Sequence, residues 1–512
     1  MLQINHLTIS HKKDLRTILE DFNFVLNRGD KAVLVGEEGN GKSTLLRWIY
    51  DPALIEDYAE ARGIRNVQGE ILAYLPQELP EAEKEKSVAG YMGTCEDPAR
   101  LSRIASELRL DNELFHSRQR MASLSGGERV KVQMTKLLLG EPDYLLLDEP
   151  SNDIDIETLE WLEKLIQNFP GGVLYISHDE TLIERTANRV VLLEQLRRKS
   201  VPRWTVANVP FRTFMDERRA AFVKQEQEAL SERREERKAM ERFRRIEQKV
   251  LADQANVSRQ DPHSGRLLKK KTKAVKSLER RYEREHEEMT ERPEEEAPIT
   301  IKLERQKAMP SGKTVIELNI PELRAPGGAA ALEGRLLARD IFLRVRGPEK
   351  LCIIGPNGAG KTTLIRKIAD ELLKRTDVKA FYMPQNYEDT LPFDQTPVDY
   401  LAPSGHKDEI TQVRTYLGSM KYTAEEMFHP IRELSGGQKA KLLLLKISLT
   451  ETDVLILDEP TRNLSPLSAP EIRGILRSFG GAMIAVSHDR KFIREVCEKV
   501  FVLGPEGLAL QE

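Results

Sequence analysis

Short, unbroken apolar runs recur in both halves of the chain. They cover residues 31–35, 144–147 and 173–176 in the first half, and 351–354, 454–457 and 483–486 in the second. A strand that is buried on both faces reads as a continuous apolar run, whereas a half-exposed strand alternates. Each half is therefore predicted to be an α/β domain built on a parallel sheet.

Between about residues 211 and 298 the pattern changes, and Glu, Lys, Arg and Gln dominate with few glycines or prolines. Such a stretch is either a solvated pair of long helices or disorder. Apolar residues fall on two seven-residue grids, which favours two helices packed antiparallel along narrow seams. One grid is Phe222, Ala229, Phe243 and Val250, and the other is Leu268, Val275, Tyr282 and Met289. Turn formers at 256–265 predict the tip of this hairpin. The predicted domains are thus 1–210, a helical hairpin linker at 211–298, and 299–512.

A glycine-rich loop follows the first apolar run of each half and precedes a helical pattern, such as Leu45, Leu46 and Ile49. This strand, loop and helix context is the one a phosphate-binding P-loop requires. The glycines let backbone N–H groups face phosphate oxygens, the lysine reaches the β- and γ-phosphates, and the Ser or Thr hydroxyl binds Mg²⁺. The residues predicted to bind ATP here are Gly36, Gly39, Gly41, Lys42, Ser43 and Thr44, and again Gly355, Gly358, Gly360, Lys361, Thr362 and Thr363.

Two acidic residues end the apolar runs at 144–147 and 454–457. An isolated Asp-Glu pair usually only ends a strand, but a P-loop needs a metal partner. Asp148 and Asp458 are therefore predicted Mg²⁺ ligands, and Glu149 and Glu459 are predicted bases for the attacking water. His178 and His488 each follow a further apolar run. A lone histidine there is more often structural, and only the repeat favours contact with the γ-phosphate.

The order and spacing of these motifs repeat. Ser125 and Ser435 each precede the acidic pair by 23 positions, and the histidines follow it by 30. With the Leu-Ser-Gly-Gly motifs at 124–127 and 434–437, the chain resembles a tandem ATP-binding-cassette protein. That resemblance implies two composite ATP sites, because the Ser-Gly-Gly turn of one cassette binds the γ-phosphate held by the other. The first site would join Lys42, Ser43, Gln77, Asp148, Glu149 and His178 to Ser435 and Gly437; the second would join Lys361, Thr362, Gln385, Asp458, Glu459 and His488 to Ser125 and Gly127. Gln77 and Gln385 would also bind Mg²⁺.

Charge is close to balanced overall, with 79 basic and 82 acidic residues, but it is uneven within the linker. Residues 257–281 carry a net charge of +7. A charge run is usually a solvated face. A cluster at the end of a projecting hairpin instead favours a polyanion partner, since lysine and arginine bind phosphate backbones without reading sequence.

Two fused cassettes with a charged linker resemble the ABC-F family of ribosome-associated ATPases. The resemblance implies a protein that enters the tRNA exit site in its ATP-bound form, with the linker reaching toward the peptidyl-transferase centre. Some members are translation factors, and others protect ribosomes from antibiotics that bind the large subunit. The residues implied to contact ribosomal RNA or tRNA are Arg259, Arg266, Lys269, Lys270, Lys271 and Lys273.

Two departures from the family pattern shape this interpretation. The motif after the second Glu-Pro reads Thr461-Arg462-Asn463-Leu464-Ser465 instead of Thr-Asn-His-Leu-Asp, so the two sites are expected to be unequal. The 48 positions from Gln77 to Ser125 leave no room for the arm that some members insert, which favours the antibiotic-protection type.

Other classes stay open. A fused transporter ATPase would not need a basic hairpin, and a coiled coil that docks a protein would not need RNA. No signal peptide or membrane-spanning apolar run is evident, and the three cysteines are widely spaced. We therefore expect a cytoplasmic monomer, without a membrane partner, whose two cassettes pair with each other.

Overall fold

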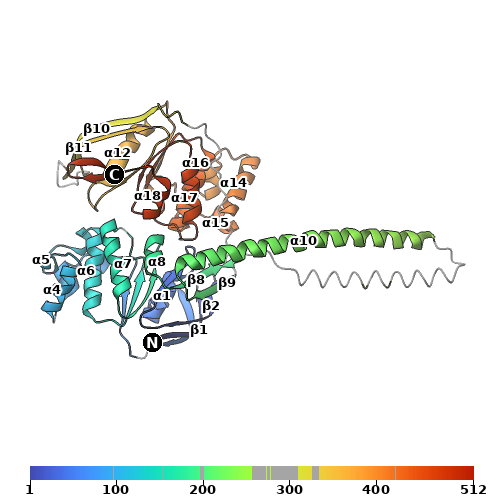
Figure 1. Cartoon of the computed structure of the whole chain (residues 1–512), viewed down its shortest axis with the longest axis horizontal. Helices are drawn as coiled ribbons and strands as arrows, with labels where there is room; N and C mark the ends of the chain where they lie inside the picture. Colours follow the sequence, from blue (N-terminus) through green and yellow to red (C-terminus); the bar gives the residue numbers. More distant parts are fainter. Residues whose placement is uncertain are drawn as a thin grey trace. The chain divides into compact units, whose positions relative to one another are not determined.

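The computed structural model describes residues 1–67, 69–95, 97–152, 154–196, 201–256, 273, 277, 309–325, 334–420 and 422–511. The chain divides into two compact units. Met1–Phe211 and Glu296–Glu512 form one unit, which holds both cassettes, and Arg212–Glu295 form the other. Figure 1 shows the elements of each in chain order.

A mixed six-stranded sheet forms the centre of each cassette. In the first, the strand order is β5 (Leu72–Leu75), β6 (Tyr144–Asp148), β7 (Gly172–Ile176), β3 (Lys31–Val35), β8 (Arg189–Gln195) and β9 (Val201–Ala207). In the second it is β13 (Ala380–Met383), β14 (Val454–Asp458), β15 (Ala482–Val486), β12 (Lys350–Ile354), β16 (Lys499–Gly504) and β17 (Gly507–Gln511). All neighbours are parallel except the last pair of each sheet. The predicted apolar runs lie in these sheets, and the α/β prediction is confirmed.

A smaller antiparallel sheet accompanies each central sheet. In the second cassette it contains β10 (Thr314–Arg324) and β11 (Leu336–Arg346). In the first it contains β1 (Leu2–His11), β2 (Thr17–Leu26) and an additional strand, β4 (Ala59–Asn66). The first cassette has 35 positions between Lys42 and Gln77, against 24 between Lys361 and Gln385. The extra residues therefore form β4 and the short helix η1 (Pro52–Ile55) before it.

Helices follow the strands in the same order in both cassettes. In the first they are α1 (Lys42–Tyr50), α2 (Glu81–Lys84), α3 (Val88–Met92), α4 (Pro98–Glu107), α5 (Asn112–Phe115), η2 (Met121–Ser123), α6 (Gly126–Leu139), α7 (Ile156–Asn168) and α8 (Glu180–Thr186). In the second they are α12 (Lys361–Leu373), η3 (Tyr387–Asp389), α13 (Pro397–Leu401), α14 (Lys407–Ser419), α15 (Ala424–Phe428), η4 (Ile431–Glu433), α16 (Gly436–Leu449), α17 (Ala469–Ser478) and α18 (Arg490–Val496).

Strand register brings the predicted catalytic motifs together. Asp148 on β6 pairs with Ile176 on β7, and Asp458 on β14 pairs with Val486 on β15. Because neighbouring parallel strands end at the same edge, the residue after each Asp lies beside the Ser-His pair after the next strand.

The other unit contains α10 (Phe211–Asn256), a helix of 46 residues that would extend about 70 Å at 1.5 Å per residue. Of the first predicted grid, Ala229 and Phe243 are buried and Phe222 is half-buried. Lys273 and Ser277 are helical and exposed. The second grid and the remaining predicted tip residues, Arg259, Arg266, Lys269, Lys270 and Lys271, lie outside the described residues. The antiparallel coiled coil therefore stays a prediction.

Two further expectations concern the whole chain. Cys95, Cys352 and Cys497 are free, with Cys352 buried and the other two half-buried. Across the described ranges, no helix combines the length and apolar character needed to cross a bilayer.

Candidate active site

The two P-loops have nearly identical backbones. Gly41 and Gly360, the residues just before α1 and α12, have φ of 84° and 96°, in the left-handed region that side chains disfavour. A Cβ on Gly41 would also collide with the Ile18 side chain. Lys42 Nζ donates to the carbonyls of Gly36 (2.7 Å) and Glu37 (3.0 Å), and Lys361 Nζ does the same to Gly355 and Pro356. Each lysine thus lies over its own loop.

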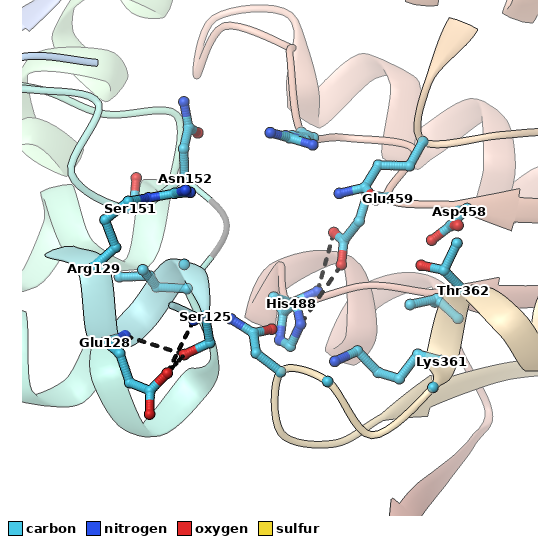
Figure 2. Close-up of a pocket in the computed structure, with 18 of the residues that line it drawn as sticks. Ser125, Glu128, Arg129, Ser151, Asn152, Lys361, Thr362, Asp458, Glu459 and His488 are labelled. Atoms are coloured by element: carbon cyan, nitrogen blue, oxygen red, sulfur yellow. Dashed lines mark hydrogen bonds and ion pairs between the residues drawn. The ribbon is translucent and has the colours of Figure 1, made fainter. Parts of the chain in front are cut away.

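A cavity of 970 Å³ lies at the second composite site. Its walls include Lys361, Thr362, Gln385, Asp458, Glu459 and His488 of the second cassette, and Ser125, Gly126, Glu128, Arg129 and Asn152 of the first. Figure 2 shows Ser125 and Glu128 on one side of it and Lys361 and Glu459 on the other. The structure therefore brings together most residues predicted for this site, from both cassettes.

Asp458 has the environment of a carboxylate that lacks a ligand. The residue is 1% exposed, and its carboxylate interacts with the Thr362 side chain but forms no hydrogen bond of full geometry among the described residues. Burial raises its pKa to about 6. Two buried carboxylate oxygens next to a P-loop threonine suit a hard divalent cation such as Mg²⁺, which binds through one or two carboxylates and substrate phosphates. In the first cassette burial likewise raises the pKa of Asp148 to about 6, and Ser43 Oγ donates to Asp148 Oδ1 at 2.9 Å.

The glutamate after each aspartate has a strained backbone, with φ of 53° at both Glu149 and Glu459. Such strain persists where surrounding structure imposes it, often at functional sites. Here the N–H of each glutamate donates to the carbonyl that precedes the Ser-His pair, Ile176 or Val486. The bond holds each glutamate beside its histidine.

The two Glu-His pairs differ in distance and in the direction in which the histidine pKa is shifted. His178 Nε2 lies 2.7 Å from Glu149 Oε1, whereas His488 Nε2 lies 3.9 Å from Glu459 Oε1. Burial opposes a charged His178, but the Glu149 carboxylate outweighs it and raises the pKa of His178. Burial and then Lys361 lower the pKa of His488 to about 4, while burial and Asp458 raise the pKa of Glu459 to about 8. The close Glu149 carboxylate thus favours the charged form of His178, whereas Glu459 and His488 of the second pair are both neutral at pH 7.

Each Ser-Gly-Gly motif begins a helix through a capping box. Ser125 accepts from the Glu128 N–H at α6, and Ser435 accepts from the Gln438 N–H at α16. Backbone N–H groups in the first turn of a helix are free to bind an anion. At α16 one of them is taken, because the Gly437 N–H donates to Glu38 Oε2 at 2.8 Å.

The first composite site is bridged by several such contacts between the cassettes. Glu37 Oε2 accepts from Lys441 Nζ at 2.8 Å, and Glu37 Oε1 accepts from the hydroxyls of Ser465 and Ser468, each at 2.5 Å. His178 Nδ1 lies 2.8 Å from the Leu464 carbonyl. At the second site the P-loop supplies the donor instead of the acceptor. The backbone N–H of Asn357 donates to the Asp155 carboxylate of the first cassette.

Farther from the P-loops, the acids and bases of the interface are segregated. Arg473 donates to Glu180 (2.6 Å), Arg490 pairs with Glu163 (2.5 Å), and Lys491 contacts Glu180 (2.9 Å) and Glu184 (2.6 Å). All of these carboxylates come from the first cassette and all of the cations from the second. The two faces are therefore complementary to each other and not to themselves.

Some predicted residues lie apart from these clusters. Gln77 is exposed after β5, and Gly127 is buried, is not part of the cavity wall, and has so little room that an added Cβ would lie 3.0 Å from Thr158 Oγ1. Sequence reasoning also missed Glu37, Glu38 and Lys441. A signal was present, because Glu37-Glu38 in the first P-loop aligns with Pro356-Asn357 in the second.

Comparison with known protein families gives a direct result. A sequence profile described as ABC transporter matches residues 19–152 and again residues 338–462, together about half of the chain. This chain belongs to that family. Its cassettes are ATP-binding domains, and the protein is an ATPase.

Individual relatives match along nearly the whole chain. The "Ribosome protection protein VmlR" of Bacillus subtilis is 28% identical over 529 residues, covering 100% of this chain and 88% of that protein. The "ABC transporter F family member 5" of Arabidopsis thaliana is 27% identical, covering 94% and 72%. The resemblance to ABC-F proteins is thus confirmed. An archaeal ribosome recycling factor, aABCE1, solved in complex with the stalk protein aP1, shares the fold with a TM-score of 0.59 and 16% identity, covering 98% of this chain and 89% of that one.

Proposed function

We propose that this protein is an ATP-dependent ribosome-binding factor that protects ribosomes from antibiotics bound in the large subunit. The observation that carries the proposal is the cavity in which Lys361 and Glu459 of one cassette face Ser125 of the other. A ligand that contacts both walls couples nucleotide state to the pairing of the cassettes.

In this proposal Lys361 and the loop glycines hold the phosphates of ATP, while Thr362 and Asp458 hold Mg²⁺. When bound, the metal supplies positive charge to the β- and γ-phosphate oxygens. Glu459 accepts a proton from the attacking water, and His488 contacts the γ-phosphate. The corresponding roles at the first site belong to Lys42, Ser43, Asp148, Glu149 and His178, and Gln77 and Gln385 complete the metal sites.

The γ-phosphate then acts as a removable link. With ATP bound, it accepts hydrogen bonds from its own P-loop and from the Ser-Gly-Gly turn of the opposite cassette, at Ser125 and Gly127 or at Ser435 and Gly437. Hydrolysis breaks this connection, and the cassettes separate at that site. Pairing in ATP and opening after hydrolysis is the order of events we assign.

The ribosomal part of the proposal is supported by the relatives. VmlR is named a ribosome protection protein, and the archaeal structure contains a ribosomal stalk protein. The linker, with its 46-residue helix α10, would carry the basic tip toward the peptidyl-transferase centre. Arg259, Arg266, Lys269, Lys270, Lys271 and Lys273 would contact ribosomal RNA or tRNA from the exit site. A monomer in the cytoplasm fits this role.

Salt dependence tests the RNA contacts. Each phosphate neutralised by a lysine or arginine adds about 0.7–0.9 to the slope of log K against log salt. Neutralising Arg266, Lys269, Lys270 and Lys271 should therefore lower the slope for ribosome binding by about 3. An unchanged slope would favour a coiled coil that docks a protein.

Translation assays distinguish antibiotic protection from two other functions, those of a general translation factor and of a transporter ATPase. Cell-free translation is inhibited with a large-subunit antibiotic, and the protein is added with ATP. Protection raises the drug concentration for half inhibition, and Lys42→Ala with Lys361→Ala abolishes that shift. A general translation factor would change translation without the drug but leave this concentration unchanged. A transporter ATPase would affect neither, which would refute the proposal.

A further inference from the structure

We infer that Glu38 is a built-in competitor of the γ-phosphate at the first composite site, where its carboxylate occupies the Gly437 N–H and, with Glu37, latches the two cassettes together before ATP binds. The inference rests on the proposed function, because it assumes that ATP uses that N–H group.

Geometry places the Glu38 carboxylate at the start of α16. Its Oε2 accepts from the Gly437 N–H at 2.8 Å, and a Cβ added to Gly437 would lie 2.8 Å from Glu38 Oε1. The carboxylate thus covers the amide and the Cα beside it. A carboxylate at this position gains the same favourable helix-terminus field as a phosphate oxygen would. Both cannot occupy the single N–H at once.

Glu37 fixes the neighbouring part of the loop. Its side chain is only 14% exposed, and it receives hydrogen bonds from Lys441, Ser465 and Ser468 of the second cassette. Burial alone would raise the pKa of Glu37, but Lys441 and the two hydroxyls lower it to about 2. It is therefore an ionised partner of Lys441 throughout the physiological pH range.

The second site lacks this arrangement in its own loop. Pro356 and Asn357 stand where the first loop has Glu37 and Glu38, and Asp155 stands where the second cassette has Ser465. There the carboxylate comes from the loop after the Asp-Glu pair and accepts from the P-loop backbone at Asn357. The 970 Å³ cavity is at this second site. The second P-loop therefore carries no carboxylate of its own that competes with ATP for the opposite Ser-Gly-Gly turn, whereas ATP must displace Glu38 from that turn at the first site.

The test measures nucleotide affinity at the first site alone, by calorimetry on the full chain with Lys361→Ala disabling the second site. Glu38→Asn installs the residue of the second loop. We expect it to tighten binding of AMP-PNP, a non-hydrolysable ATP analogue, by about tenfold, because charge-assisted hydrogen bonds are stronger than neutral ones. ADP has no γ-phosphate, and its affinity should change by less than about threefold. Glu38→Gln should act in the same direction, and Glu56→Gln, which removes an exposed charge, should change neither.

The outcomes separate the latch from the proposed function. Equal gains for AMP-PNP and ADP would mean simple charge repulsion, and no gain for either would mean no competition; each overturns the inference. Absence of binding that depends on Lys42, tested with Lys42→Ala, would instead overturn the nucleotide site itself.

Discussion

The buried ion pair between Arg473 and Glu180 should hold the outer part of the cassette interface closed. The side chains are 4% and 7% exposed, and Arg473 donates to both carboxylate oxygens, at 2.6 and 3.3 Å. Arg473→Met keeps much of the volume and removes the charge. Leaving one partner of a buried pair behind costs roughly 3–5 kcal/mol. Because Lys491 still contacts Glu180 at 2.9 Å, we expect the lower end of that range, about 3 kcal/mol.

Amide hydrogen exchange measures this cost locally. If opening of the interface costs about 3 kcal/mol less in Arg473→Met, amide exchange in α8 and α18 should be roughly a hundredfold faster, since 1.4 kcal/mol is a factor of ten. Arg494→Met is the matched control, because Arg494 lies on α18 but is 76% exposed and reaches Glu495 only at 4.0 Å. It should change exchange by no more than about threefold. If both variants exchange alike, the buried pair does not hold the interface.

Three further predictions concern the sites themselves. With the first site disabled by Lys42→Ala, kcat/KM for ATP should rise with pH and level off above about 8, because Glu459 acts as a base only after losing its proton. Glu459→Gln should remove this rise. A profile that falls with pH would contradict the assignment of Glu459 as the base. Asp458→Asn should raise the Mg²⁺ concentration needed for half-maximal ATPase activity by at least about tenfold in a magnesium titration. An unchanged concentration would place the metal elsewhere. With the second site disabled by Lys361→Ala, Gly41→Ala should abolish the remaining ATP binding in a filter assay, because its φ of 84° and the Ile18 side chain exclude a Cβ; near-normal binding would show that the loop can relax.

Much of the fold could be predicted because its signals are local. An unbroken apolar run such as 144–147 is buried on both faces wherever it lies in the chain, and a glycine-rich loop before Lys42 requires its own backbone conformation. The repeat relates each local motif to a second copy, and the resemblance to tandem ATP-binding-cassette proteins implies that Ser125 and Lys361 belong to one site.

The contacts of Glu37 and Glu38 could not be predicted in the same way. The hydrogen-bond partners of the two carboxylates, Gly437, Lys441 and Ser465, belong to the second cassette and lie about 400 or more positions away. Only packing of the two cassettes reveals these contacts. The raised pKa of Glu459 is likewise tertiary, because it arises from burial and from the neighbouring Asp458 carboxylate.

Segregation of charge across the interface also has a consequence for assembly. With acids on the first cassette and bases on the second, two first cassettes would repel each other at Glu163, Glu180 and Glu184. Pairing of a first cassette with a second cassette is the arrangement that satisfies these charges.

The central claim is that ATP at the two composite sites controls binding to the ribosome. Co-sedimentation of the Glu149→Gln, Glu459→Gln double variant with ribosomes tests it most directly, because the amides keep the geometry of the sites but cannot accept the proton of the attacking water. We predict stable binding in ATP and little in ADP, with the wild type released as it hydrolyses ATP. Equal sedimentation in ATP and ADP, or none in either, would contradict the account.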